Sequence, residues 1–334
     1  MATIKDVARK TGLSLATISK YLNGGHVLEE NRQAIEAAIN NLGYSVNRMA
    51  RGLKTSRSMT VGVLIPDLEN AFITSIVSNL ENILLQAGYS TLICDYKHNP
   101  VIEHEKLAFL AARSIDGLVM MPLNGCPDDL RTLQMRHVPV VLLDRPVRGL
   151  TCDAVLVKNR QAAFGAADLL LTAGHRRIGF IGGPTGIYTA DERLEGYLAA
   201  HQAHDLTADR QLIRQGQYDA ESGYQLTVEL LSAADPPTAL FATNNEMTFG
   251  AVLAMHTLGI HIPEDLSVIG FDNQMLATVH QPVLSTVLQP LRQIGETAAE
   301  LLLRRMRGCL DDYPAVHQLD TIWLPGASVK NLQS

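Results

Sequence analysis

From Thr60 onward, short apolar runs alternate with amphipathic stretches along the chain. The runs are rich in β-branched residues, which predicts strands. The stretches between them, such as residues 73–88 and 162–174, carry apolar residues at helical spacing. Continuous apolar strands separated by helices predict parallel sheets that are covered on both faces. The expected strands are residues 60–66, 90–95, 117–122, 138–144, 177–183, 212–216, 239–244 and 266–272.

The number of these units indicates more than one compact body. Eight strand–helix units exceed a typical domain, and a break near Asp153–Arg160 divides them into two similar lobes. Residues 284–308 predict one further helix, and residues 316–329 predict one further strand. The pattern therefore predicts an α/β, two-lobed body with doubly wound parallel sheets.

The first 46 residues have a different pattern, with apolar residues at helical spacing. Residues 3–12, 14–23 and 29–43 predict three short helices. Thr3 and Asp6 have the spacing of a capping box, and Ser14 is a good N-cap for the second helix. Two short helices joined by a tight turn and braced by a third are typical of a helix-turn-helix.

The second of these helices holds the candidate DNA contacts. Its outward face is predicted to carry Leu15, Ala16, Thr17, Ser19 and Lys20, most of them short enough to let a helix enter a major groove. Apolar side chains meet thymine methyl groups there, hydroxyls bind phosphates or base edges, and a lysine reaches a guanine or a phosphate. The alternative interpretation is the polar side of a helix in a small bundle.

The uneven distribution of charge is compatible with DNA binding and, taken alone, equally with chance clustering of basic residues on a solvated surface. Residues 1–60 hold nine Lys or Arg and four Asp or Glu, whereas the rest of the chain holds 19 and 30. A basic head on an acidic body indicates a polyanion-binding module attached to a body of another kind.

Polar side chains gather at the carboxyl ends of the predicted strands, where ligands bind in open α/β sheets. They are Asp67, Asp95, Asp144, Asn244, Asn245 and Asp272. Arg193 is expected to begin the helix after the sequence GGPTG. Carboxylates, amides and an arginine around one cleft suit a polyhydroxylated ligand, whose hydroxyls both donate and accept. For any one of these residues, the alternative is a helix cap or a polar loop residue.

Other classes of protein lack support in the sequence. The glycine-rich stretch GFIGGPTG has neither P-loop nor GxGxxG spacing, HEKLA lacks the second histidine of a zinc protease, and no GxSxG elbow is present. We therefore expect no enzyme activity, no catalytic residues, no metal and no cofactor. Four cysteines without a CxxC pair, no membrane-length apolar run and no export signal predict a cytoplasmic protein.

Two stretches, TIKDVARKTGLSLATISKYLN and LGYSVNRMARGLKT, resemble the head of the lactose-repressor/galactose-repressor (LacI/GalR) family of bacterial transcription regulators. The resemblance extends over nearly the whole chain. It implies a helix-turn-helix domain at residues 1–46, a hinge helix or linker at 47–58, and an effector-binding and dimerisation domain at 59–334 with a periplasmic-binding-protein-like fold. In such a fold the first lobe would comprise about 59–158 and 290–320, and the second about 159–288 and 322–334.

The resemblance also implies residue roles. Leu15, Ala16 and Lys20 occupy the positions that most often select bases of the operator in this family. Lys20 and Tyr21 differ from the family, in which an Arg and an aliphatic residue are usual. Two other departures are Asn70-Ala71-Phe72-Ile73, where NPFF is common, and Asn245, where Asp is common. The implied effector-contacting residues are Asn70, Phe72, Asp144, Arg193, Tyr218, Asn244 and Asp272.

The basic stretch NRMARGLKTSRS, residues 47–58, is predicted to be a linker in the free protein and an ordered helix on DNA. It is too short for a stable isolated helix, yet Asn47 is a good N-cap and most of its residues favour helix. Leu53 would be the apolar wedge in the minor groove, with Arg51 and Lys54 near phosphates. The alternative is a leucine packed against the body.

Together these features predict a homodimeric repressor of carbohydrate-utilisation genes on a pseudo-palindromic operator, with a small sugar-like effector between its lobes. Whether the effector induces or co-represses stays open. One alternative is control by a protein co-effector, such as a phosphocarrier protein. Others are a sugar-processing α/β enzyme with a DNA-binding head, and an exported sugar-binding protein.

Overall fold

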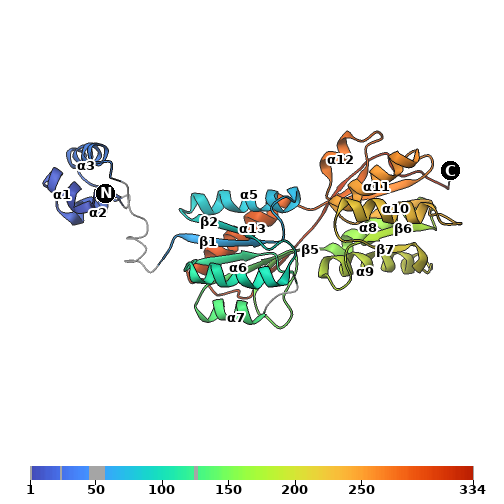
Figure 1. Ribbon diagram of the computed structural model, residues 1–334, viewed down its shortest axis with the longest axis horizontal. Helices are drawn as coiled ribbons and strands as arrows, with labels where there is room; N and C mark the ends of the chain where they lie inside the picture. The colour runs from blue at the N-terminus through green and yellow to red at the C-terminus, as the bar shows by residue number, and fades with distance from the viewer. Residues whose placement is uncertain (1, 23–24, 45–56, 124–126, 334) are drawn as a thin grey trace. The chain divides into compact units, whose positions relative to one another are not determined.

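The computed structural model describes residues 2–22, 25–44, 57–123 and 127–333, which form two separate units, Met1–Ser58 and Met59–Ser334. The first unit contains α1 (Ile4–Thr11), α2 (Leu15–Leu22) and α3 (Glu29–Leu42) (Figure 1). Val7, Ile18 and Ile35, one from each helix, are fully buried and form its core. The three predicted helices are confirmed.

Side-chain caps set the ends of the first two helices. The Thr3 side chain accepts a hydrogen bond from the Asp6 N–H, and the Asp6 carboxylate accepts one from the Thr3 N–H, so the predicted capping box is present. Gly12 adopts a left-handed conformation, with φ of 69°, and ends α1. The Ser14 Oγ accepts from the Thr17 N–H at 3.1 Å and begins α2.

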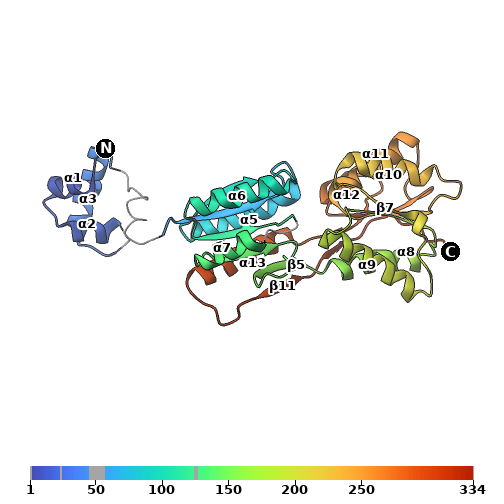
Figure 2. The same cartoon turned by 60° about the horizontal axis from the view of Figure 1, so that its bottom comes forward.

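The second unit contains two six-stranded sheets, each of which forms the centre of one lobe (Figures 1 and 2). The first-lobe sheet has the order β11-β5-β4-β3-β1-β2 and is parallel throughout its described pairs. Its strands are β1 (Thr60–Ile65), β2 (Ser90–Asp95), β3 (Gly117–Met120), β4 (Val140–Leu143), β5 (Asp153–Val157) and β11 (Val316–Leu319).

Helices cover both faces of this sheet. On one face lie α5 (Ala71–Gln86) and α13 (Leu291–Met306), whose Leu80 and Leu302 are fully buried against the strands. On the other face lie α6 (Pro100–Ala112) and α7 (Pro127–Met135). This layering follows from the continuous apolar strands, because both faces of such a sheet need a cover.

The second-lobe sheet has the order β12-β10-β9-β8-β6-β7. Its edge strand β12 runs antiparallel to β10, whereas its other described pairs are parallel. One face is covered by α8 and α9, and the other by α10, α11 and α12. The elements are β6 (Ile178–Gly182), β7 (Ile213–Gln215), β8 (Ala239–Ala242), β9 (Ser267–Phe271), β10 (Ser285–Leu288), β12 (Ile322–Leu324), α8 (Asn159–Thr172), α9 (Tyr188–Ala203), α10 (Ala220–Leu231), α11 (Asn245–Leu258) and α12 (Gln274–Val279).

All eight predicted runs contain strands, and the α/β two-lobed fold is confirmed. The predicted break near Asp153–Arg160 begins with a strand that the pattern missed, the buried β5 (Asp153–Val157), and the chain passes to the second lobe directly after it. Two predictions about the remaining segments are wrong. Residues 316–329 contain two short strands in different sheets, β11 and β12, and not one strand. Residues 284–308, predicted as one helix, contain strand β10 before helix α13.

The chain crosses between the lobes three times in the described residues: after β5, after β10 and after β11. As a result α13 and β11 belong to the first lobe although most of the second lobe precedes them. Two of the crossing segments are joined by an ion pair in which the Lys158 Nζ lies 2.7 Å from the Asp320 Oδ1.

A buried ion pair fastens the returning segment to the first lobe. The Arg305 Nε in α13 lies 2.7 Å from the Asp153 Oδ2 in β5, and both side chains are almost completely buried. The second Asp153 oxygen accepts from the Ala315 N–H at 2.7 Å, just before β11. One carboxylate therefore holds three elements that are far apart in the sequence.

Candidate functional site

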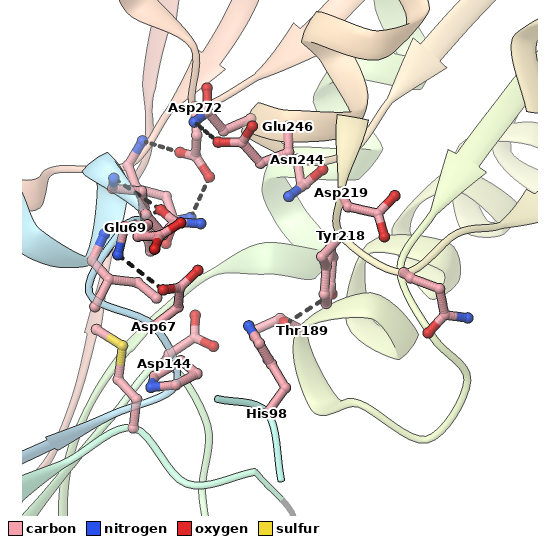
Figure 3. A pocket seen from close by; sticks show the side chains of 18 of the residues that line it. Asp67, Glu69, His98, Asp144, Thr189, Tyr218, Asp219, Asn244, Glu246 and Asp272 are labelled. Atoms are coloured by element: carbon pink, nitrogen blue, oxygen red, sulfur yellow. Dashed lines mark hydrogen bonds between the residues drawn. The ribbon is translucent and has the colours of Figure 1, made fainter. Parts of the chain in front are cut away.

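The second unit contains a pocket of about 530 Å³ that is lined by residues from both lobes (Figure 3). It lies at the carboxyl ends of the strands, where a ligand site is expected in this class of fold. The structure brings all seven predicted effector residues to its wall: Asn70, Phe72, Asp144, Arg193, Tyr218, Asn244 and Asp272. Asp67 and Asn245 also line it, whereas Asp95 is not among the described lining residues and pairs instead with Lys97, 2.9 Å away.

Two asparagines combine a capping role with a place in the pocket. The Asn70 Oδ1 accepts from the Phe72 N–H at 3.0 Å and begins α5. The Asn244 Oδ1 accepts from the Met247 N–H at 2.8 Å and begins α11. The cap fixes each side chain and leaves its amide NH₂ group as the donor that a ligand can use.

Asp144 follows β4 in a left-handed conformation, with φ of 68°. Its Oδ2 accepts from the Arg145 Nη2 at 3.0 Å and from the Arg145 Nε at 3.2 Å. Arg145 also lines the pocket, and its charge partly balances the carboxylate. The pair is held together before any ligand arrives.

Asp272 follows β9, also in a left-handed conformation, with φ of 66°. Its two oxygens accept from the Gln289 backbone N–H at 3.1 Å and from the Gln289 Nε2 at 2.7 Å. Burial raises the pKa of Asp272 to about 6, an effect that the nearby Arg193 charge and the Gln289 hydrogen bonds partly oppose. Gln289 lies on the second crossing, so this contact links the site to the connection between the lobes.

Arg193 lies in the second turn of α9, because that helix begins at Tyr188 rather than at Arg193 as predicted. Its Nε donates to the Asn159 Oδ1 at 2.8 Å, and its Nη1 donates to the Thr243 carbonyl at 2.5 Å. The guanidinium also lies 3.9 Å from the centre of the Phe271 ring. These contacts hold a buried cation at the edge of the pocket.

Tyr218 presents its ring to the pocket from a left-handed backbone position, with φ of 64°. Its hydroxyl lies 3.2 Å from the Thr189 Oγ1, as Figure 3 shows. The ring lies directly against Gly183, where even a methyl group would overlap it. Glycine is therefore needed at position 183 for the ring to take this place.

The sequence analysis missed several lining residues. His98, Thr189 and Gln289 reach the pocket from segments that are not directly continuous with a predicted strand end. Glu69, Asp219 and Glu246 adjoin polar residues already singled out, and that adjacency was a usable signal. Desolvation lowers the pKa of His98, against the opposing effect of the nearby Asp67 carboxylate.

Of the five α2 side chains predicted to point outward, three are exposed and two are half-buried. Ala16 and Lys20 are exposed, and Leu15 keeps 45% of its surface exposed. Thr17 and Ser19 are half-buried, and the Thr17 hydroxyl lies 2.9 Å from the Ser14 Oγ, so part of its hydrogen-bonding capacity is used at the helix start. The predicted hinge contacts, Asn47, Arg51, Leu53 and Lys54, lie outside the described residues.

Two further findings concern the described residues as a whole. Within them, no three His, Cys, Asp or Glu side chains are grouped so as to hold a metal ion. None of the helices in this part of the chain is long and apolar enough to span a membrane.

Comparisons with known proteins agree with this geometry. Residues 3–47 match the family described as bacterial regulatory proteins, lacI family, and residues 167–329 match the periplasmic binding protein-like domain. The chain is 35% identical over 310 residues to the HTH-type transcriptional repressor PurR of Proteus mirabilis, covering 92% of this chain and 91% of that protein.

Two solved structures are similar over nearly the full length. A structure of the Lac repressor dimer bound to operator and the anti-inducer ONPF has a TM-score of 0.87 at 25% identity, covering 98% of this chain and 99% of that one. A complex of the transcriptional regulator CelR with cellobiose has a TM-score of 0.74 at 29% identity, covering 98% of this chain and 100% of that one.

Proposed function

The chain belongs to the lacI family of bacterial regulatory proteins, and from that premise we propose that it represses carbohydrate-utilisation genes in response to a sugar-like ligand. The family consists of DNA-binding transcription regulators. The observation that carries the ligand proposal is the pocket, in which seven predicted effector residues from both lobes meet. We place the protein in the cytoplasm, without enzyme activity of its own.

The first unit supplies the DNA contacts of this proposal. Leu15, Ala16 and Lys20, which are exposed on α2, would face base edges in a major groove, and the hydroxyls of Thr17 and Ser19 would bind phosphates or base edges. Residues 1–46 would form the DNA-binding domain and residues 47–58 the hinge. A homodimer would place two such heads on the two halves of a pseudo-palindromic operator.

The pocket suits a sugar because its donors and acceptors are fixed before binding. Asn70 and Asn244 would donate their amide N–H groups, and Asp144 and Asp272 would accept from ligand hydroxyls. Tyr218 would offer a flat apolar face to the ring of the sugar. CelR, whose structure contains cellobiose, shows that a protein of this fold takes such a ligand.

A ligand in this pocket would couple the two sites through the lobes. It would contact residues of both lobes, so it favours the lobe arrangement in which those contacts coexist. A change in that arrangement would alter the spacing of the two hinge segments in the dimer, and with it the affinity for the operator.

The test is a thermal-shift screen of free sugars with the full chain, followed by measurement of operator affinity with each sugar that binds. The operator would be selected from random duplex DNA. We expect at least one sugar to raise the melting temperature and to change operator affinity. If sugars bind without any change in operator affinity, or if the protein turns a sugar over, the proposal is wrong.

A variant separates ligand response from DNA binding. In Gly183→Ala the added methyl group would displace the Tyr218 ring, so we expect about tenfold weaker sugar binding, the effect of about 1.4 kcal/mol, with operator affinity unchanged. Gly165→Ala, in α8, is the matched control, because a methyl group there meets no atom within 4 Å. Equal loss of sugar binding in both variants would remove the Tyr218 ring from the site.

A further inference from the structure

The described residues that line the pocket carry far more negative than positive charge. Six carboxylates face it, against the two guanidinium groups of Arg145 and Arg193. Some of these carboxylates lie on the first-lobe loops and others at the starts of second-lobe helices, so the negative charge surrounds the space (Figure 3). The six are Asp67, Glu69, Asp144, Asp219, Glu246 and Asp272.

In both guanidinium groups the Nε–H, one half of the side-on donor pair that clamps an anion, already has a protein partner. Arg145 directs its Nε and Nη2 to Asp144, and its Nη1 to the Leu123 carbonyl at 3.4 Å. Arg193 has its Nε and Nη1 engaged by the second lobe, as described above. Bidentate recognition of a phosphate or carboxylate needs a guanidinium whose paired N–H groups face the ligand.

Three helix N-termini at the pocket are capped by side chains. An exposed helix N-terminus binds phosphate through its free N–H groups. Here the Asn70, Asp219 and Asn244 side chains accept from those groups at the starts of α5, α10 and α11. The start of α9 has no side-chain cap; there Asp191 adds a carboxylate in the first turn, whose Oδ1 accepts from the N–H of Gly186, just before the helix, at 3.1 Å.

Other nearby basic groups do not offset this charge. The Lys97 Nζ is paired with Asp95 at 2.9 Å, so this pair balances itself. Desolvation lowers the pKa of His98, which disfavours a positive charge on its ring. A phosphate placed in the pocket would meet uncompensated carboxylates at short range in a partly desolvated space, where Coulomb repulsion is strong.

We propose that the pocket selects its ligand by charge: it takes a sugar without phosphate or carboxylate groups and rejects the phosphorylated form of the same sugar. This inference rests on the proposed sugar-binding function. It also places the ligand in a reaction sequence, because the sensed form is the substrate of a phosphoryl transfer to the sugar and not its product. A kinase reaction would consume the signal, and hydrolysis of a sugar phosphate or a glycoside would supply it.

The test compares matched ligands on the full chain by isothermal titration calorimetry. The pairs are ribose with ribose 5-phosphate, glucose with glucose 6-phosphate, and galactose with galactose 6-phosphate. Glucuronate tests the carboxylate, and the uncharged 6-O-acetyl esters of the two hexoses control for size. We expect the phosphate of any sugar that binds to bind at least about tenfold more weakly than the free sugar, since one repulsive contact at intermediate dielectric has that effect.

The dependence on salt and the effect of charge-removing variants identify the cause of the rejection of phosphorylated sugars. If rejection is Coulombic, the affinity ratio between free and phosphorylated sugar falls as sodium chloride rises from about 0.05 M to about 0.5 M. It also falls, by about tenfold, in the double variant Asp219→Asn/Glu246→Gln, which removes two charges and keeps a good N-cap at position 219. Glu264→Gln, an exposed carboxylate outside the pocket lining, is the control and leaves the ratio unchanged.

The outcomes are distinguishable. A phosphorylated sugar that binds as well as its free form overturns charge selection and leaves the proposed function intact. A ratio that responds neither to salt nor to the double variant, with the acetyl esters rejected equally, assigns the rejection to size and also overturns it. If neither the free nor the phosphorylated sugars bind, the proposed function itself is wrong, and charge selection falls with it.

Discussion

At the scale of single residues, backbone conformation aims the pocket side chains. Asp144, Tyr218 and Asp272 have φ angles of 68°, 64° and 66°, in the left-handed region that non-glycine residues seldom occupy. His98, with φ of 53°, is a fourth pocket residue of this kind. Such conformations persist only where the surroundings hold them, and they concentrate at functional sites. The strained positions therefore agree with the placement of the ligand at this pocket.

Asp272 gives a prediction about pH. Its carboxyl group has a folded-state pKa raised to about 6, so it becomes protonated as the pH falls from 7 to 5. Its ionised form accepts hydrogen bonds, and a ligand that donates hydroxyls to it is expected to lose affinity as the pH falls through about 6. Sugar affinity measured between about pH 5 and pH 8 would show this loss.

The control for this prediction is Asp272→Asn, which has no proton to gain. We expect it to bind the sugar more weakly at neutral pH and to show a flatter profile between pH 5 and pH 8. An unchanged slope in this variant would assign the pH dependence to another group.

At the scale of elements, strand β5 shows what local pattern cannot predict. Its first residue, Asp153, is fully buried, and an aspartate at the start of a short apolar run favours a loop when neighbouring residues alone are considered. The residue is accommodated because Arg305, 152 positions later, neutralises it. β10 was missed for a similar reason, since its Ser285 N–H is satisfied by the distant Ser328 Oγ at 2.8 Å.

The ion pair of β5 and α13 gives a prediction about stability. Arg305→Met would leave the Asp153 carboxylate buried without its cation, which costs about 3–5 kcal/mol of the free energy of unfolding. Arg304→Met is the matched control, because the Arg304 side chain is 45% exposed and its ion pair with Asp312 contributes at most about 1 kcal/mol. Urea denaturation followed by circular dichroism measures both, and equal midpoints would contradict the prediction.

The pocket itself was more predictable than the late strands. Asp144, Asn244 and Asp272 each lie within two residues of the carboxyl end of a strand that the apolar pattern identified, so the rule for open α/β sheets placed them correctly in space. Arg193 was singled out from the sequence by its place after the GGPTG turn, whereas Tyr218 rested on the family resemblance alone. Gln289 could be found by neither route, because its contact with Asp272 depends on where the second crossing returns the chain.

At the scale of the whole molecule, the proposed function requires one coupling free energy between two sites. If a sugar changes operator affinity by some factor, the operator must change sugar affinity by the same factor, since both routes lead to the same ternary complex. We predict that Leu53→Ala, in the proposed hinge, weakens specific operator binding and leaves the sugar affinity of the DNA-free protein nearly unchanged.

Fluorescence anisotropy with labelled operator and calorimetry with the sugar measure the two affinities separately. Lys106→Ala, in α6 of the first lobe, serves as the control for loss of one large side chain that belongs to neither the head nor the hinge. Operator affinity equal to that of the unmodified protein would remove Leu53 from the DNA contacts.

The threefold crossing between the lobes has a consequence for synthesis on the ribosome. The strands β1 to β5 emerge first, but the helix α13 that covers one face of their sheet emerges only after most of the second lobe. The helix α5 covers part of that face early, but at translation rates of about 5–20 residues per second the part that α13 covers waits on the order of ten seconds. The first lobe is thus begun early and completed late, and the nascent chain must be shielded from aggregation during that interval.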